Sequence, residues 1–163
     1  MLDRPIIKIL KPHGDGRGRV IESYRASWFP GVPPVVQAVQ SDSRPHVMRA
    51  MHAHKLQWDI WHFTDGEAFV QLYDHRDGWY EAFDAGRGLT VAIPPGVSHG
   101  FYTARGCTLV YLLTREYDGS DEYGWNAIDP TWPGASYWPK HITPEISVRD
   151  MTAPSLQEFI EKW

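Results

Sequence analysis

The sequence predicts an all-β protein, either a β-sandwich or a small barrel. Short runs rich in Val, Ile, Trp, Tyr and Thr recur along the chain, and clusters of Gly, Pro and Asp that favour turns separate most of them. Only one segment has the pattern of a helix. Many short strands with almost no helix are typical of sandwiches and barrels. A chain of 163 residues has the length of one domain, so residues 1–163 are expected to form a single domain.

Nine strands are expected from this pattern. Their ranges are Ile6–Leu10, Val20–Tyr24, Val35–Ser41, Val47–His54, Trp58–Phe63, Glu67–Asp74, Trp79–Phe83, Leu89–Ile93 and Cys107–Thr114. The composition of Thr64-Asp65-Gly66 predicts a turn between the fifth and sixth strands. The short C-terminal helix is expected at residues 155–162, where Ser155 and Glu158 have the spacing of a capping box. Residues 117–154, rich in Pro, Trp and Gly, are expected to wrap the barrel as ordered loop.

Charge and cysteine content exclude several classes of protein. A net charge of −4 and an isoelectric point near 6.0 give no basic surface for nucleic acid. No apolar run reaches the roughly 18 residues that cross a bilayer, and Asp3, Arg4 and Pro5 stand where a signal peptide is apolar. The single cysteine, Cys107, cannot form an internal disulfide. We expect a cytoplasmic protein that binds neither nucleic acid nor membrane.

Histidine and aspartate residues lie inside or beside predicted strands, where polar side chains are unusual. His52 and His54 are two positions apart, so both side chains point to one face of an extended strand. Asp59 follows in an apolar strand, and the turn at Pro94-Pro95-Gly96 leads from a buried strand to His99. We expect these four side chains to meet in a polar pocket inside the barrel.

The spacings resemble the two motifs of the cupin superfamily, a His-x-His pair followed by an acidic residue and a glycine, and Gly-x5-Pro-x-Gly-x2-His. Asp59 stands for the usual Glu, and His46 for a common leading Gly. The resemblance covers residues 46–103 and implies a double-stranded β-helix, or jelly-roll barrel, often with a divalent metal ion. The implied ligands, which suit Fe, Mn, Ni, Zn or Cu better than Ca or Mg, are His52, His54, Asp59 and His99.

A structural interpretation of the same residues stays open. A histidine pair on a strand can be partly exposed surface, and Asp59 could pair with His62 or Arg76 instead of a metal.

Segments along nearly the whole chain, from about residue 15 to 154, resemble one branch of the cupins, the dTDP-4-dehydrorhamnose 3,5-epimerase family. They follow one another in the family's order and with compatible spacing. The segments are Asp15-Gly16-Arg17-Gly18, Glu22-Ser23-Tyr24, Val36-Gln37, Val47–His52, Ile93–Phe101, Tyr111, Tyr117, Glu122, Trp125-Asn126, Trp138-Pro139 and Ile146–Asp150.

The resemblance implies a reaction. Family members epimerise a 4-keto-6-deoxy sugar carried on dTDP by removing a proton alpha to the ketone and returning it on the other face, with no required cofactor. This chemistry needs a base of near-neutral pKa and an acid on the opposite side. By resemblance, His52 is the base, Asp150 holds its ring, and Tyr111 is the acid.

Contacts with a nucleotide-diphosphate sugar are implied as well. The planar guanidinium fork of arginine suits the diphosphate. The implied contact residues are Arg17, Glu22, Gln37, Arg49, His99, Tyr117, Glu122 and Arg149. Structural roles remain open for some of the matched residues. Arg17 can be a solvated loop residue, and Asp150 can cap a turn. Tyr117 and Trp125 can pack the tail against the barrel.

The chain departs from the family at the centre of the predicted site. The family has a lysine that stabilises the developing enolate where this chain has Asp59. A metal ion held by His54, Asp59 and His99 could replace that ammonium group as a Lewis acid. If His52 also binds the metal, its lone pair cannot accept a proton. Without a metal, Lys55 is the only nearby cation that the sequence offers.

We therefore predict an epimerase or isomerase of a dTDP-4-keto-6-deoxyhexose. Two alternatives stay open, a metal-dependent cupin enzyme for a small oxygenated molecule and a non-catalytic module that binds a sugar nucleotide. The family forms dimers, so a homodimer is expected, in which the apolar strand Pro5–Leu10 could add to the sheet edge of a second copy.

Overall fold

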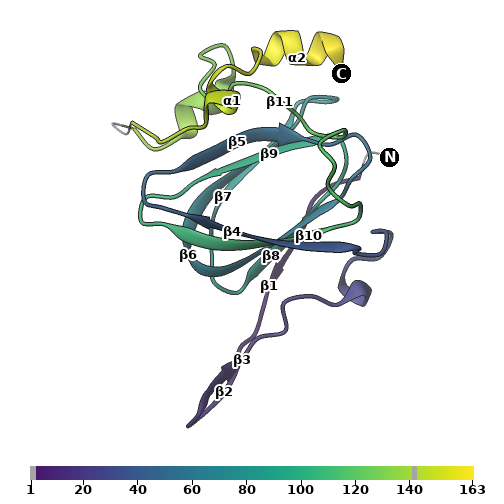
Figure 1. Cartoon of the computed structure of the whole chain (residues 1–163), viewed down its shortest axis with the longest axis vertical. Coiled ribbons are helices and arrows are strands. Elements are labelled where there is room, and N and C mark those ends of the chain that lie inside the picture. The colour runs from purple at the N-terminus through teal and green to yellow at the C-terminus, as the bar shows by residue number, and fades with distance from the viewer. Residues whose placement is uncertain (1–2, 141–142) are drawn as a thin grey trace.

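Two antiparallel sheets face each other in the computed structural model, which describes residues 3–140 and 143–163 (Figure 1). The first sheet has the strand order β1-β8-β6-β10-β4, and the second has the order β7-β6-β9-β5-β11. The strands are β1 (Ile6–Ile9), β4 (Gln37–Ser43), β5 (Met48–Ala53), β6 (Asp59–Asp74), β7 (Trp79–Gly86), β8 (Leu89–Ile93), β9 (Val97–Tyr102), β10 (Cys107–Leu113) and β11 (Tyr123–Gly124). The predicted all-β fold is confirmed.

Strand β6 is shared by both sheets. Its first half pairs with β8 and β10, and its second half pairs with β7 and β9. Gly66 lies between the halves with φ +70°, and a Cβ there would lie 2.1 Å from the carbonyl oxygen of Gly106. The prediction of two strands separated by a turn was therefore wrong, because Gly66 bends one continuous strand at an irregularity in its pairing with β10.

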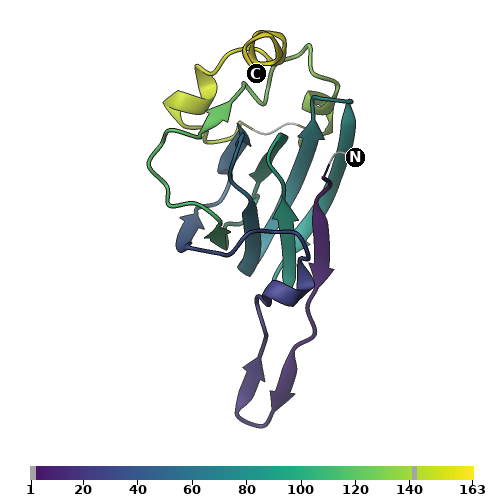
Figure 2. The same ribbon diagram turned by 90° about the vertical axis from the view of Figure 1, so that its right-hand side faces the viewer.

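The predicted strand at Val20–Tyr24 was also wrong. The chain instead forms a hairpin of β2 (His13–Asp15) and β3 (Gly18–Val20), which projects from the barrel (Figure 2). A tight turn at Asp15–Gly18 joins the two strands. Strand β9 was missed as well, because its residues follow directly on the turn at Pro94–Gly96.

Aromatic rings fill the space between the sheets. Trp61 and Phe63 of β6 pack edge-on against Phe101 of β9, with ring centroids 5.8 and 6.3 Å apart. All three are almost fully buried, together with Leu72 and Leu109. Burial of such large apolar side chains is the main stabilising contribution to a small domain.

The tail packs on the outer face of the second sheet, as predicted. Its core contains Trp125 and Trp132, whose rings are 4.6 Å apart, and both are packed against Met51 of β5. The tail is more regular than expected, because it contains the single-turn helix α1 (Val148–Met151) before α2 (Leu156–Lys162). The predicted capping box of Ser155 and Glu158 is confirmed. No helix in the described ranges is long and apolar enough to cross a membrane.

Strand β1 pairs with β8 of its own chain. The sequence had suggested that this strand could add to the sheet of a second copy, but its hydrogen-bonding partner here lies in the same chain. Strand β1 forms one edge of the first sheet.

His75 connects the barrel to helix α2. Its ring packs edge-on against Phe159 and Trp163, with centroids 5.2 and 4.7 Å away, and neither ring nitrogen has a hydrogen-bond partner among the described residues. Burial lowers the pKa of His75; the neighbouring Asp74 opposes this effect and Arg76 adds to it. The neutral ring is therefore the form that fits this contact.

We expect Gly66→Ala to lower the free energy of unfolding by about 3 kcal/mol, because strain at positive φ adds to overlap with the backbone of the neighbouring strand. Gly78→Ala is the matched control, since Gly78 also has positive φ (+77°) but an added Cβ there meets nothing within 4 Å. That change should cost only about 1 kcal/mol. Urea unfolding measures both values, and equal losses would contradict the packing argument.

We expect His75→Phe to reduce the loss of stability on acidification. The folded-state pKa of His75 is lowered, so the unfolded chain binds this proton more tightly, and stability falls as the pH drops below about 6.5. Without the ionisable ring, the contribution of His75 to this loss of stability disappears. Thermal unfolding at a series of pH values tests this, with His13→Gln on the exposed hairpin as control. Parallel curves for wild type and His75→Phe would refute it.

Candidate active site

A cavity of about 650 Å³ is lined by side chains of β4, β5, β6, β9 and β10 and by residues of the tail. Its volume is typical of pockets for small molecules. Most of the site residues predicted from sequence line it. They are Gln37, Arg49, His52, His54, Asp59, His99, Tyr111, Tyr117, Glu122 and Arg149.

His52 and Asp150 form a hydrogen-bonded pair, although they are far apart in sequence. His52 lies on β5 opposite His99 of β9, and its Nε2 donates to Asp150 Oδ1 at 3.0 Å. Because a carboxylate oxygen only accepts, this bond places the proton of a neutral ring on Nε2 and leaves the lone pair on Nδ1. Arg149 Nη2 lies 3.0 Å from the same Nε2, which cannot accept from this guanidinium while it donates to Asp150. Asp150 does not cap the following turn; it lies in α1, where Ser147 is the N-cap and accepts from the backbone N–H of Asp150.

Asp150 is buried, and burial alone would raise its pKa. Its hydrogen bond to His52 and the nearby guanidinium of Arg149 have the larger combined effect, so the pKa of Asp150 is lowered. The carboxylate is therefore ionised at neutral pH.

Arg149 links this pair to the mouth of the cavity. Its Nη1 donates to Glu122 Oε1 at 2.6 Å, and its Nε lies 3.3 Å from Asp150 Oδ1. Tyr117 donates its hydroxyl proton to the other oxygen of Glu122 and is itself 54% exposed. Tyr117 lines the cavity, whereas the fully buried Trp125 packs the tail. Of these two residues, only Trp125 has the packing role that the sequence left open.

Tyr111 of β10 lies in the same cavity. Its ring packs edge-on against Trp61, with centroids 5.9 Å apart. Burial raises the pKa of Tyr111, and Ser41 and Arg49 only partly oppose this effect. The phenol therefore keeps its proton at neutral pH and can act as a donor.

A second group joins His54, Asp59 and His99, all buried. The Nε2 atoms of His54 and His99 lie 3.6 and 3.7 Å from Asp59 Oδ2. His52 is not part of this group, because no ring nitrogen of His52 lies within 4.8 Å of all three of the other ligand atoms. The four-residue ligand set predicted from sequence is therefore reduced to three.

The alternative partners suggested for Asp59 are not used. His62 instead bonds Thr90, and Arg76 pairs with Asp74.

Ionisation within this group is unequal. Burial would raise the pKa of Asp59, but His54 and His99 lower it to about 2. Burial also lowers the pKa of His99, to about 4, despite the attraction of Asp59. For His54, Asp59 and Asp121 have a larger combined effect than burial, and its pKa is raised.

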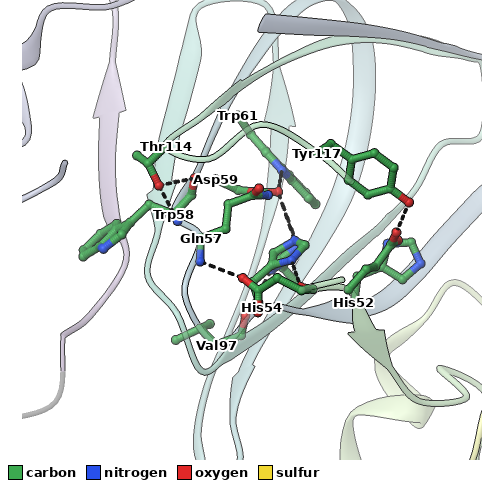
Figure 3. Close-up of polar contacts among 12 residues, drawn as sticks. His52, His54, Gln57, Trp58, Asp59, Trp61, Val97, Thr114 and Tyr117 are labelled. Carbon is green, nitrogen blue, oxygen red and sulfur yellow. Dashed lines mark hydrogen bonds and ion pairs between the residues drawn. The ribbon is translucent and has the colours of Figure 1, made fainter. Parts of the chain in front are cut away.

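Sequence reasoning missed two supporting residues. Asp121 accepts hydrogen bonds from the backbone N–H groups of Lys55, Leu56 and Gln57, and its own carbonyl bonds His54 Nδ1 at 2.6 Å. Gln57 Nε2 donates to Asp59 Oδ1 at 2.6 Å (Figure 3). The shortened segment after His54 was the only sign in the sequence that this loop is unusual. No sequence pattern connects Gln57 to Asp121, which lies 64 positions later.

Three predicted residues lie elsewhere. Lys55 does not reach into the cavity; its Nζ lies 4.6 Å from the ring centroid of Tyr123, on the outside. Arg17 is on the hairpin, with its side chain 91% exposed and paired with Asp15. Glu22 is also exposed and pairs with Arg25. The cations that do line the cavity are Arg49 and Arg149.

Comparisons with known proteins agree with this geometry. The model of the dTDP-4-dehydrorhamnose 3,5-epimerase family matches residues 3–158. The chain belongs to this family. Its members include enzymes on the same fold, so the predicted family, the jelly-roll barrel and the epimerase class are confirmed.

Individual relatives show how far the similarity extends. A spore coat polysaccharide biosynthesis protein, SpsL of Bacillus subtilis, is 34% identical over 72% of this chain and 83% of its own length. The rmlC epimerase of Mycobacterium tuberculosis superposes with a TM-score of 0.87 at 26% identity, over 97% of this chain and 86% of that one. A Legionella pneumophila RmlC, solved with dTDP-4-keto-L-rhamnose, gives 0.84 at 26% identity, over 96% and 89%.

Proposed function

We propose that this protein epimerises a dTDP-4-keto-6-deoxyhexose at C3, C5 or both. The observation that carries the proposal is the His52–Asp150 hydrogen bond in a cavity that also contains the protonated phenol of Tyr111. A base held by a carboxylate and a separate acid are the two groups that proton transfer between faces requires.

In the proposed reaction, His52 removes a proton from the sugar and Tyr111 supplies another. The Nδ1 lone pair of His52 takes the proton alpha to the ketone, and the electrons of that C–H bond move into the enolate. Tyr111 then delivers its hydroxyl proton to the opposite face of the carbon. Exchange with solvent returns the imidazolium and the phenolate to their starting forms. Asp150 stabilises the imidazolium that forms in the first step.

The substrate class is supported by the charges around the cavity. Arg49 and Arg149 provide guanidinium groups for a diphosphate, and Gln37 and Tyr117 provide neutral hydrogen-bonding groups. Glu122 holds Arg149 in position.

A homodimer accounts for the residues that lie outside the cavity. We propose that the projecting hairpin of β2 and β3 reaches the cavity of a second copy, so that Arg17 and Glu22 contact the sugar nucleotide there. An isolated two-stranded hairpin is only marginally stable in water, which favours a partner surface. The cytoplasmic location expected from sequence stays a prediction.

The two alternatives differ in their support. A non-catalytic binding module has no specific feature in its favour and is excluded by turnover in the exchange experiment below. A metal-dependent reaction has one observation in its favour, the buried group of His54, Asp59 and His99. A metal ion at that group is compatible with epimerisation, because His52 lies outside it.

We expect solvent deuterium to appear at C3 or C5 of dTDP-4-keto-6-deoxyglucose when the protein is incubated in deuterium oxide. His52→Asn should slow this exchange by about 10³-fold, because general base catalysis contributes roughly 10²–10⁴-fold. Nuclear magnetic resonance follows the labelled positions. His75→Phe, at a residue that does not line the cavity, is the control and should exchange at the wild-type rate. No exchange by the wild-type protein would refute the proposal.

We expect Arg17→Ala and His52→Asn to complement each other if the homodimer is formed as proposed. A mixed dimer has one cavity that combines His52 of one copy with Arg17 of the other, so random mixing restores about a quarter of the cavities. Each variant alone should be much less active. Turnover is measured after the variants are unfolded and refolded together. Activity no higher than the mean of the separate variants would show that Arg17 does not act across a dimer.

A further inference from the structure

We infer that His54, Asp59 and His99 form a binding site for a divalent transition-metal ion. One ligand atom from each residue lies within 4.8 Å of the others, and all three side chains are buried. Two imidazole nitrogens and one carboxylate oxygen favour a first-row transition ion over calcium or magnesium.

Hydrogen bonds at the far side of each ring direct a lone pair toward the centre of the group. His54 Nδ1 donates to the carbonyl of Asp121 at 2.6 Å, and His99 Nδ1 donates to the carbonyl of Val97 at 3.0 Å. Because a carbonyl oxygen only accepts, the neutral form of each ring carries its proton on Nδ1 and its lone pair on Nε2. Outer hydrogen bonds of this kind orient metal-binding histidines.

The carboxylate of Asp59 is oriented in the same way. Its Oδ1 accepts the 2.6 Å hydrogen bond from Gln57, which leaves Oδ2 toward the two imidazoles. Trp61 Nε1 lies 3.4 Å from Oδ2, on another side (Figure 3). Each of the three ligands is thus held by a neighbour that does not itself belong to the group.

The distances fit an ion between these atoms better than direct contact. His54 Nε2 and His99 Nε2 lie 3.6 and 3.7 Å from Asp59 Oδ2, longer than the roughly 2.7–3.2 Å of N–H···O hydrogen bonds. Ligands at about 2.0–2.2 Å from a tetrahedral ion are about 3.4 Å apart. The two distances to Asp59 Oδ2 are close to this value, and the ligand atoms of the two histidines lie within 4.8 Å of each other.

The metal site and the proposed base do not compete. His52 is held by Asp150, outside the three-residue group, so its Nδ1 lone pair stays available while an ion is bound. Both line one cavity, so the ion could stabilise negative charge on the ketone oxygen as a Lewis acid. That role rests on the proposed function, whereas binding of the ion does not.

The test is metal binding by the full chain, produced without a histidine tag. The protein is stripped with EDTA and titrated with CoCl2 and, separately, ZnCl2, and bound metal is measured by elemental analysis and by the visible absorption of Co²⁺. We expect one ion per chain. Asp59→Asn and His99→Gln should each weaken binding about 100-fold, with circular dichroism to show that the variants fold. Should either variant fail to fold, His54→Gln replaces it.

His52→Asn is the matched control, because it removes the neighbouring imidazole of the same strand. It should bind one ion with an unchanged Co²⁺ spectrum. Loss of binding in this variant would overturn the three-residue assignment. A wild-type protein that binds neither Co²⁺ nor Zn²⁺ would refute the site altogether. If that same protein still exchanges substrate protons, the proposed function stands without the metal.

Discussion

The barrel depends on one strand that belongs to both of its sheets. Strand β6 can do this because Gly66 adopts a backbone conformation with positive φ and approaches the neighbouring strand more closely than any side chain allows. The bend carries Asp59, at the beginning of the strand, into the first sheet, while the later residues pair in the second. The bend at Gly66 therefore helps to set the position of the buried Asp59 carboxylate, although the two residues are seven positions apart.

Two carboxylates in this site have different tasks. Asp150 is hydrogen-bonded to one imidazole and fixes its tautomer. Asp59 faces two imidazoles at longer distances and is ionised despite its burial. A buried carboxylate is costly unless cations or hydrogen-bond donors surround it, so Gln57 and the two histidines offset the cost of burying Asp59. The separation of the two groups removes the conflict between a base and a ligand that the sequence raised for His52.

The fold and most of the site were predictable because they depend on local patterns and on ordered motifs. Alternation and turn residues located most strands, and the motif order predicted that His52 and Tyr111 share one cavity and that Asp150 pairs with His52. The errors have physical reasons. Gly66 has the composition of a turn but bends a continuous strand, and β9 follows its turn without a break. The position of Lys55 depends on Asp121 and on Tyr123, contacts that no local pattern encodes.

The last part of the chain also completes the pair of residues proposed for proton transfer. His52 is in place once β5 pairs with β9, but Asp150 arrives only when α1 docks behind it. During synthesis on a ribosome, an almost complete barrel would still have an unsupported imidazole. A truncated product that ends before α1 would lack Asp150 and would therefore lose the proton-transfer pair.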